Sequence, residues 1–243
     1  MTKAVMVPLL LAGMILSMVG CLPEPGESYS NIPADPAVVR KIDGSTYIST
    51  PRGHFLAPDL SDKEDKACLI VDYTVYPDRN PLTAEAIQVL LSVKQNIAEK
   101  KESMVVEEDT LPFITITPVT YSEFLDGKIF FELTHSMTKD AEIAYQMTWV
   151  PTTNGSTDEF DVYFTATQIS AGQGYVARYS NFHVFDTKSL IQEYGKGLFS
   201  NDKNRYVQLH FYCFKEFDKD HTPQWQFLYS YVNPNNRFGI FSE

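Results

Sequence analysis

The chain is poor in the residues and motifs that most enzyme classes require. It has three cysteines and five histidines among 243 residues, and no C-x-x-C pair that would form a redox dithiol. The sequence also lacks the G-x-S-x-G of serine hydrolases, the H-E-x-x-H of zinc peptidases and a glycine-rich loop that opens a helix. We therefore expect no catalytic residues, no metal site and no cofactor.

Positive charge is scarce as well. Lysine and arginine total 20 against 31 aspartate and glutamate residues, and the net charge is −11. The densest cationic pair, Lys100 and Lys101, is flanked by Glu99 and Glu102. Because affinity for phosphate backbones comes from clustered cations, we expect no nucleic-acid partner.

The longest apolar stretch lies at the start of the chain. Lys3 is followed by a stretch without charge, residues 4–19, and then by Gly20 and Cys21. This layout is typical of a secretory signal, and the stretch is shorter than the ~20 residues that a membrane-spanning helix needs. We predict a signal peptide over residues 1–20.

Residues 18–21, Met-Val-Gly-Cys, resemble the lipobox of bacterial lipoproteins, with methionine where leucine is usual. The resemblance implies that Cys21 carries diacylglycerol and an acyl chain such as palmitate, which together anchor a protein stably in a membrane. We expect this to be the outer membrane of the cell envelope, with the protein facing either the periplasm or the outside. The alternative is a plain secreted protein with a cysteine near its cleavage site.

The rest of the chain divides by composition. Residues 21–33 are rich in proline and poor in apolar side chains, which is typical of an extended tether. A polar, charged connector at residues 98–110 then separates a small N-terminal part, residues 34–98, from a larger C-terminal part, residues 111–243. We expect each part to fold as a domain with its own core.

Apolar and polar residues alternate with a period of two through most of both parts, which predicts half-buried strands. Turn dipeptides such as Asp126-Gly127 separate the strands. The clearest strand segments are rich in aromatic and β-branched residues: 69–76, 129–134, 143–150, 160–166 and 225–231. We therefore predict an all-β protein.

Two segments also show helical features. Residues 83–97 fit the alternation of a strand and equally the i, i+3, i+4 spacing of a helix, so both interpretations stay open. Residues 188–194 are predicted as a short helix that ends at Gly195. Neither segment alters the all-β class.

The two cysteines beyond the predicted anchor, Cys68 and Cys213, each lie within an apolar, strand-like run. Export permits disulfides, so a bridge between them is one interpretation. The other, which we favour, is two buried free thiols that pack as small apolar side chains.

Three segments together resemble the NigD-like lipoproteins of Bacteroides-type bacteria. The first is Ala-Cys-Leu-Ile-Val-Asp-Tyr-Thr-Val at residues 67–75, where Asp72 stands at a position that is often asparagine in that family. The others are Leu-Asp-Gly-Lys-Ile-Phe-Phe-Glu-Leu at 125–133 and Phe-His-Val-Phe-Asp-Thr-Lys-Ser-Leu at 182–190. The resemblance implies a small OB-like barrel followed by a larger antiparallel β-sandwich. It supplies no functional residue other than the lipidated cysteine.

Aromatic residues are concentrated near the C-terminus, within residues 211–231. They suit a sandwich core, where large rings bury the most area, and this is the interpretation we favour. They also suit an exposed face that stacks on a glycan or packs against a protein partner. Under this second interpretation the candidate binding residues are Tyr212, Trp225, Tyr229 and Tyr231.

These observations predict a membrane-anchored, exported lipoprotein that serves as a binding or accessory module and is not an enzyme. One alternative is a structural subunit of a surface assembly or a bacteriocin-linked protective protein, which requires an unpaired edge strand or a broad interface. A third is a glycan-acting hydrolase, which requires a cleft with convergent carboxylates. The sequence leaves open whether the partner is a glycan or a protein.

Overall fold

The computed structural model describes residues 28–119, 125–152, 159–188 and 207–233. Its secondary structure there is almost entirely β, with one short 3₁₀ helix, η2 (Pro58–Leu60), which confirms the all-β prediction. No helix in these ranges is long and apolar enough to cross a membrane. The predicted signal peptide, Cys21 and most of the tether lie outside the described residues, as does the helix predicted at 188–194 beyond its first residue.

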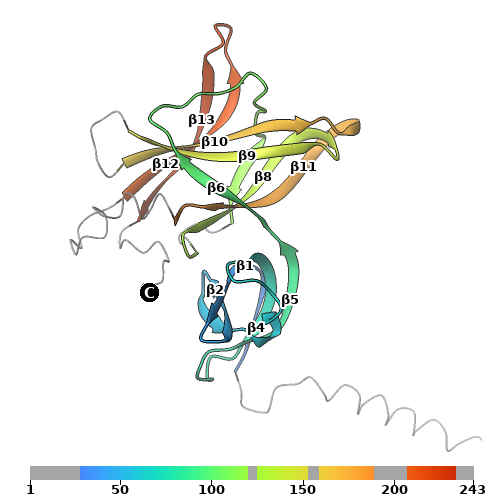
Figure 1. The fold of residues 1–243 in the computed structure, drawn as a ribbon, viewed down its shortest axis with the longest axis vertical. Coiled ribbons are helices and arrows are strands. Elements are labelled where there is room, and N and C mark those ends of the chain that lie inside the picture. Colours follow the sequence, from blue (N-terminus) through green and yellow to red (C-terminus); the bar gives the residue numbers. More distant parts are fainter. Residues whose placement is uncertain (1–27, 120–124, 153–158, 189–206, 234–243) are drawn as a thin grey trace, which may run out of the picture.

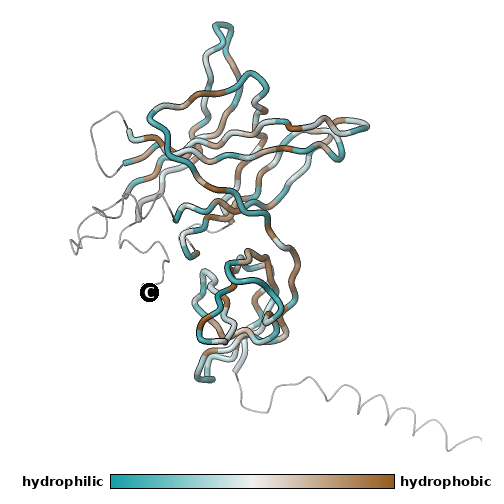
Figure 2. Tube along the Cα trace, in the orientation of Figure 1, coloured by the Kyte–Doolittle hydropathy of each residue, from teal (hydrophilic) through white to brown (hydrophobic). Residues whose placement is uncertain are grey.

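The first sheet is a small barrel, drawn at the bottom of Figure 1, and hydrophobic and hydrophilic residues alternate along its strands in Figure 2. A parallel bridge between Leu56 and Thr83 brings its third strand beside the start of its fifth. The resulting ring order, 1-2-3-5-4, makes the sheet a nearly closed, OB-like barrel. Its strands are β1 (Ser30–Ile42), β2 (Ser45–Thr50), β3 (Gly53–Leu56), β4 (Cys68–Val75) and β5 (Ala84–Ser92).

The residue that departs from the family pattern, Asp72, has a structural role in this barrel. Its Oδ1 accepts a hydrogen bond of 2.7 Å from the backbone N–H of Ala34. Ala34 has a positive φ of 47° and lies where the register between β1 and β4 shifts, between Ile32 and Asp35. The carboxylate therefore holds a β-bulge in place.

The segment that the sequence left open is strand rather than helix. After β5 ends at Ser92, β6 (Lys94–Lys100) leaves the barrel and enters the second sheet, as Figure 1 shows. Lys94–Ile97 pair with one strand of that sheet, and Ala98–Lys100 pair with another. The first strand of the second sheet thus begins within the predicted range of the N-terminal domain, and its last residues lie in the predicted connector.

The second sheet folds into a β-sandwich because β6 joins two halves that face each other. One half contains β7, β8 and β11, and the other contains β9, β10, β12 and β13. Most neighbours are antiparallel, but β6 is parallel to both its neighbours and β10 is parallel to β12. The strands are β7 (Thr115–Pro118), β8 (Lys128–Lys139), β9 (Glu142–Pro151), β10 (Glu159–Ser170), β11 (Gln173–Asp186), β12 (Val207–Phe217) and β13 (Pro223–Asn233).

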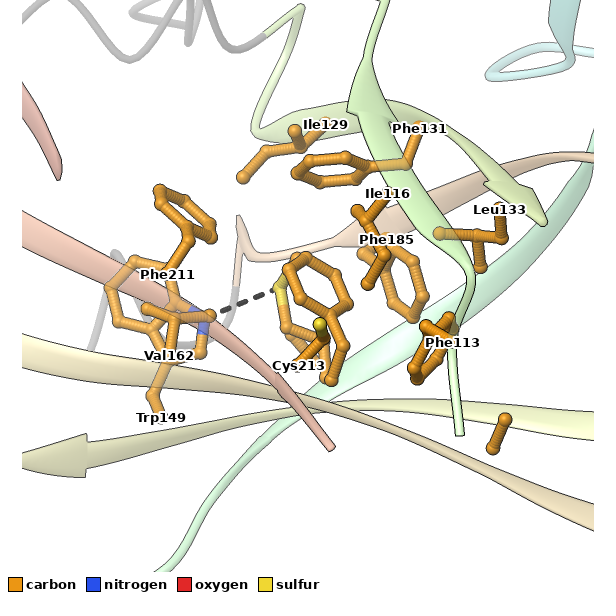
Figure 3. Packing of buried hydrophobic residues seen from close by; sticks show 14 of the residues in the cluster. Phe113, Ile116, Ile129, Phe131, Leu133, Trp149, Val162, Phe185, Phe211 and Cys213 are labelled. Atoms are coloured by element: carbon orange, nitrogen blue, oxygen red, sulfur yellow. Dashed lines mark hydrogen bonds between the residues drawn. The ribbon is translucent and has the colours of Figure 1, made fainter. Parts of the chain in front are cut away.

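The core of the sandwich is built from aromatic rings that project from both halves (Figure 3). Phe131 on β8 packs edge-on against Phe164 on β10, with the ring centroids 4.8 Å apart. Phe185 on β11 and Phe211 on β12 contact the same two rings. The indole N–H of Trp149 lies 3.5 Å from the sulfur of Met147, so the one polar atom of this large ring has a soft acceptor.

A separate apolar cluster joins the barrel to the sandwich. Next to it, the guanidinium of Arg40 on β1 contacts the carboxylate of Asp126 at 2.7 Å, and both groups are largely buried. Asp126 and Gly127 form the tight turn before β8, with φ of 50° and 74°, which matches the Asp-Gly signal in the sequence. The cluster contains Val38, Cys68, Ile70, Val93, Leu125, Phe130 and Val184.

The two cysteines belong to different clusters and are both buried and unbridged, as favoured from the sequence. Cys68 lies at the junction of barrel and sandwich, and Cys213 lies in the sandwich core. Burial raises the pKa of the Cys68 thiol to about 12 and that of Cys213 to about 11. Both sulfurs therefore stay protonated and unreactive at neutral pH.

Candidate functional site

Four aromatic side chains gather on the face of β10, β12 and β13 that points away from the sandwich core. They contact one another, and none belongs to the core cluster of buried residues. Tyr163, Tyr212 and Trp225 are half-buried, and Phe227 is 53% exposed. We call these four residues, Tyr163, Tyr212, Trp225 and Phe227, the outer aromatic face.

The alternation of β10 and β12 places two of these rings together. On β10, Val162 and Phe164 point into the core, so Tyr163 between them points outward. On β12, Phe211 points into the core and Tyr212 points outward in the same way. The parallel register sets Tyr163 directly beside Tyr212, and the two rings stack with their centroids 5.2 Å apart and their planes 22° apart.

A β-bulge brings the aromatic residues of β13 to this face. The pairing with β12 passes from Phe211↔Tyr229 to Tyr212↔Phe227, so Leu228 is an extra residue on β13. A bulge of this kind shifts the alternation by one position. Tyr229 therefore packs into the core, stacked on Phe211 at 4.8 Å, whereas Phe227 contacts Tyr212 at 5.5 Å on the outside.

Trp225 closes the outer aromatic face on its other side. Its ring lies 4.5 Å from that of Tyr163 and 6.0 Å, edge-on, from that of Phe214. Phe214 is fully buried and also contacts Phe217. The outer rings therefore rest on an apolar base of their own, which fixes their positions at little cost in side-chain entropy.

The candidate binding residues from the sequence separate into three groups. Tyr212 and Trp225 lie on the outer aromatic face, and Tyr229 is half-buried and packs against the core. The side chain of Tyr231 lies outside the described residues. Sequence reasoning missed Tyr163 and Phe227; Tyr163 was detectable as an aromatic residue out of phase with the inward-facing residues of its strand.

Polar groups border the rings along the next positions of β10 and β12. Asp161 lies beside His210 in the register, and the imidazole Nδ1 is 2.8 Å from the hydroxyl of Ser230. His210 Nε2 is 3.8 Å from a carboxylate oxygen of Glu159. The face thus offers carboxylates, an imidazole and a hydroxyl at the edge of an aromatic surface.

Partial burial changes the acidity of two of these groups. Burial raises the pKa of Asp161, and the nearby His210 partly offsets the rise. Burial also raises the pKa of Tyr163 to about 12, with the charge of Asp161 adding to the effect. The phenol therefore remains a hydrogen-bond donor at neutral pH.

The two carboxylates that border the rings lie on one strand. Glu159 and Asp161 project from the same strand, and thus lie side by side, whereas glycoside hydrolysis needs two carboxyl groups on opposite sides of the scissile bond. In the described part of the chain, no three His, Cys, Asp or Glu residues are grouped so as to hold a metal ion.

No protein-family model matches the chain, and no curated protein matches it in sequence. Among solved structures, an uncharacterized protein from Parabacteroides merdae is similar with a TM-score of 0.62 and 13% identity, over 83% of this chain and 98% of that one. A NigD-like immunity protein from Bacteroides caccae is similar with a TM-score of 0.46 and 12% identity, over 84% and 94%. The predicted resemblance thus has a counterpart among solved structures, and at these identities the likeness extends to the fold alone.

Proposed function

We propose that the protein is an exported, lipid-anchored, non-catalytic binding module whose outer aromatic face binds a neutral glycan. The observation that carries the proposal is a row of four rings on the outer side of strands whose other side is core. The rings are joined by the contacts Tyr163–Tyr212, Tyr163–Trp225 and Tyr212–Phe227. Adjoining aromatic side chains that stay partly exposed on a folded domain are candidate interaction sites.

The chemistry of the face favours a sugar. A pyranose ring presents a face of C–H groups that packs on an aromatic ring, and a rim of hydroxyls that need hydrogen-bond partners. The four rings of the outer aromatic face supply the apolar surface. Asp161, His210 and Ser230 supply donors and acceptors beside it.

The charge of the protein favours a neutral glycan over an acidic one. The chain carries a net charge of −11, and Glu159 and Asp161 border the rings themselves. A uronic acid or sulfated sugar would bring like charge to this surface and would be repelled. Neutral hexose or pentose polymers meet no such penalty.

A glycan-binding test separates this role from a merely structural one. The detergent-solubilised, full-length protein is titrated against neutral oligosaccharides of the β-glucan, xylan and mannan types. We expect at least one series to bind and Trp225→Ala to weaken that binding by about tenfold or more, as expected for a central aromatic contact. Tyr175→Ala is the control, because Tyr175 is 81% exposed on β11 and does not belong to the outer aromatic face.

The absence of binding to every neutral series would contradict the glycan proposal. An equal loss of affinity in Trp225→Ala and Tyr175→Ala would show that binding occurs elsewhere. A thermal melt of each variant, recorded in parallel, separates loss of binding from loss of folding.

The lipid anchor is tested separately. We expect cells that express the wild type to incorporate labelled palmitate into the protein, and cells that express Cys21→Ala not to. Protease treatment of intact cells then gives the orientation: cleavage places the domain outside, and protection places it in the periplasm. Failure of the wild type to take up lipid would overturn the anchor.

One observation favours a second candidate, a subunit of a surface assembly. β13 stands at the end of the strand order and carries the exposed ring of Phe227, and a terminal strand of this kind can pair with a strand of another chain. This role predicts self-association or a stable protein complex. Sedimentation of the solubilised protein checks it, and a monomer that binds glycans would exclude self-assembly.

A further inference from the structure

We propose that the protein has a second ligand site, a cavity at the end of the sandwich core that takes a small zwitterion, namely a free apolar amino acid. The cavity has a volume of about 330 Å³ and lies among the starts of β6 and β9, the middle of β11 and the end of β5. It is distinct from the outer aromatic face, none of whose four residues lines it.

The cavity exists because β6 changes its pairing partner along its length. β6 pairs with β11 from Lys94 onward but with β9 only from Ala98 onward. Before that point the first residues of β9 are not paired with β6, so the two halves of the sandwich separate. The space between them forms the mouth of the cavity.

The inner wall is polar where the rest of the core is apolar. The rings of Tyr145 on β9 and His183 on β11 meet across the gap with their centroids 4.1 Å apart. His183 is only 8% exposed, and burial together with the nearby charge of Lys94 lowers its pKa to about 4. The imidazole is therefore neutral at pH 7, and it offers hydrogen bonds without charge.

Two opposite charges line the cavity on different strands. Lys94 stands at the start of β6 and Glu142 at the start of β9. Neither has an ion-pair partner among the residues that the structure describes, although eight pairs within those residues join a lysine or arginine to an acid. A ligand with one charge of each sign complements this pair, whereas a simple anion or cation would be attracted by one group and repelled by the other.

Apolar side chains supply the remaining contacts. Ile143 is buried, and Met137 and Phe182 are half-buried around the same space. An amino acid such as leucine would place its carboxylate toward Lys94, its ammonium toward Glu142 and its side chain against Ile143 and Met137. The volume lies at the lower end of the range for small-molecule pockets, which suits a ligand of this size and excludes a polymer.

Calorimetric titration with L-leucine and two truncated analogues tests the proposal on the full-length protein. We expect L-leucine to bind with a Kd of about 1 mM or tighter. 4-Methylpentanoate lacks the ammonium group and 3-methylbutylamine lacks the carboxylate, so each should bind more weakly, by up to about fivefold, which is what one exposed ion pair contributes at most.

Substitutions test whether Lys94 and Glu142 bind the two charged groups of the ligand. Lys94→Gln and Glu142→Gln should each weaken leucine binding by about fivefold. Lys63→Gln, which removes a half-buried lysine that pairs with Asp62 in the barrel, and Trp225→Ala should leave it unchanged. Absence of binding by leucine, methionine and phenylalanine alike would overturn the proposal, as would equal affinity for the amino acid and its analogues. Trp225→Ala should weaken glycan binding and leave leucine binding unchanged, so the variant separates the two sites. Failure of the leucine test therefore leaves the glycan proposal intact, and failure of the glycan test leaves the leucine proposal intact.

Discussion

The two faces of one sheet, formed by β10, β12 and β13, use aromatic residues for opposite purposes. The inner face carries Phe164 and Phe211, which are closed off from solvent and contact rings of the facing half. The outer face carries mainly tyrosine and tryptophan, which keep a polar atom at the surface. An apolar ring suits a site whose neighbours are all apolar, and an amphipathic ring suits a site that is exposed to solvent on one side. At the adjacent positions 163–164 of β10 and 211–212 of β12, phenylalanine thus lies on the buried side and tyrosine on the partly exposed side.

The largest expected effect tests this comparison on two adjacent residues of β10. Phe164→Ala should lower the free energy of unfolding by about 3–5 kcal/mol, because it leaves a cavity among closely packed rings. Tyr163→Ala, one position earlier and on the other face, should cost only about 1 kcal/mol. Chemical denaturation of both variants measures the difference. Equal losses would show that the outer rings belong to the structural core.

A second test concerns His183 on β11, in the half of the sandwich that faces these strands. Because the pKa of His183 is about 4 in the folded protein and about 6.5 when unfolded, the unfolded chain binds more protons between these values. The free energy of unfolding should therefore fall by roughly 3 kcal/mol as the pH drops from 6.5 to 4. His135 contributes with the same sign, since burial lowers its pKa too.

Denaturation curves at a series of pH values measure this dependence, and a variant locates it. His183→Gln should flatten the curve over this range, whereas His210→Gln, on the outer face, should leave the contribution of His183 in place. An unchanged slope in His183→Gln would mean that this buried imidazole is not the source.

The smallest expected effect concerns the interaction between Tyr163 and Asp161 on the outer face. Tyr163 interacts with the carboxylate of Asp161 and lowers its pKa, against the larger effect of burial. Tyr163→Phe should therefore raise the pKa of Asp161 further while keeping the stacked ring and changing stability by less than about 1 kcal/mol. Carbon-detected NMR titration of the Asp161 carboxyl group measures the shift. A fall in this pKa would contradict the assigned interaction.

The sequence predicted those features that depend on short-range periodicity. Alternation through Phe160, Val162 and Phe164 identified an inward-facing strand, and Asp126-Gly127 identified a tight turn. The division of the C-terminal aromatics between two faces was not predictable, because it depends on an extra residue, Leu228, that is defined only by the pairing of β13 with β12.

The pairing of β6 and the cavity escaped prediction for a related reason. The alternation in residues 94–100 is compatible with any neighbouring strand, and the switch from β11 to β9 is decided by contacts far apart in the chain. The cavity walls come from five strands, so no local pattern marks them. The pairing of Tyr163 with Tyr212 is easier to predict. Alternation places each ring on the outer side of its strand, so the two rings are expected on the same face once β10 and β12 are known to be neighbours.

The fluorescence of Trp225 tests the glycan-binding role of the outer aromatic face most directly. The chain has two tryptophans, and Trp149 is buried in the core, so the Trp149→Phe variant leaves Trp225 as the sole reporter on the outer face. We expect its emission to change and saturate as a neutral oligosaccharide of the β-glucan, xylan or mannan type is added, with the same midpoint as binding measured by calorimetry. Calorimetric binding without any change in the Trp225 emission, or no binding of any of these sugars, would contradict the assignment of the glycan site to this face.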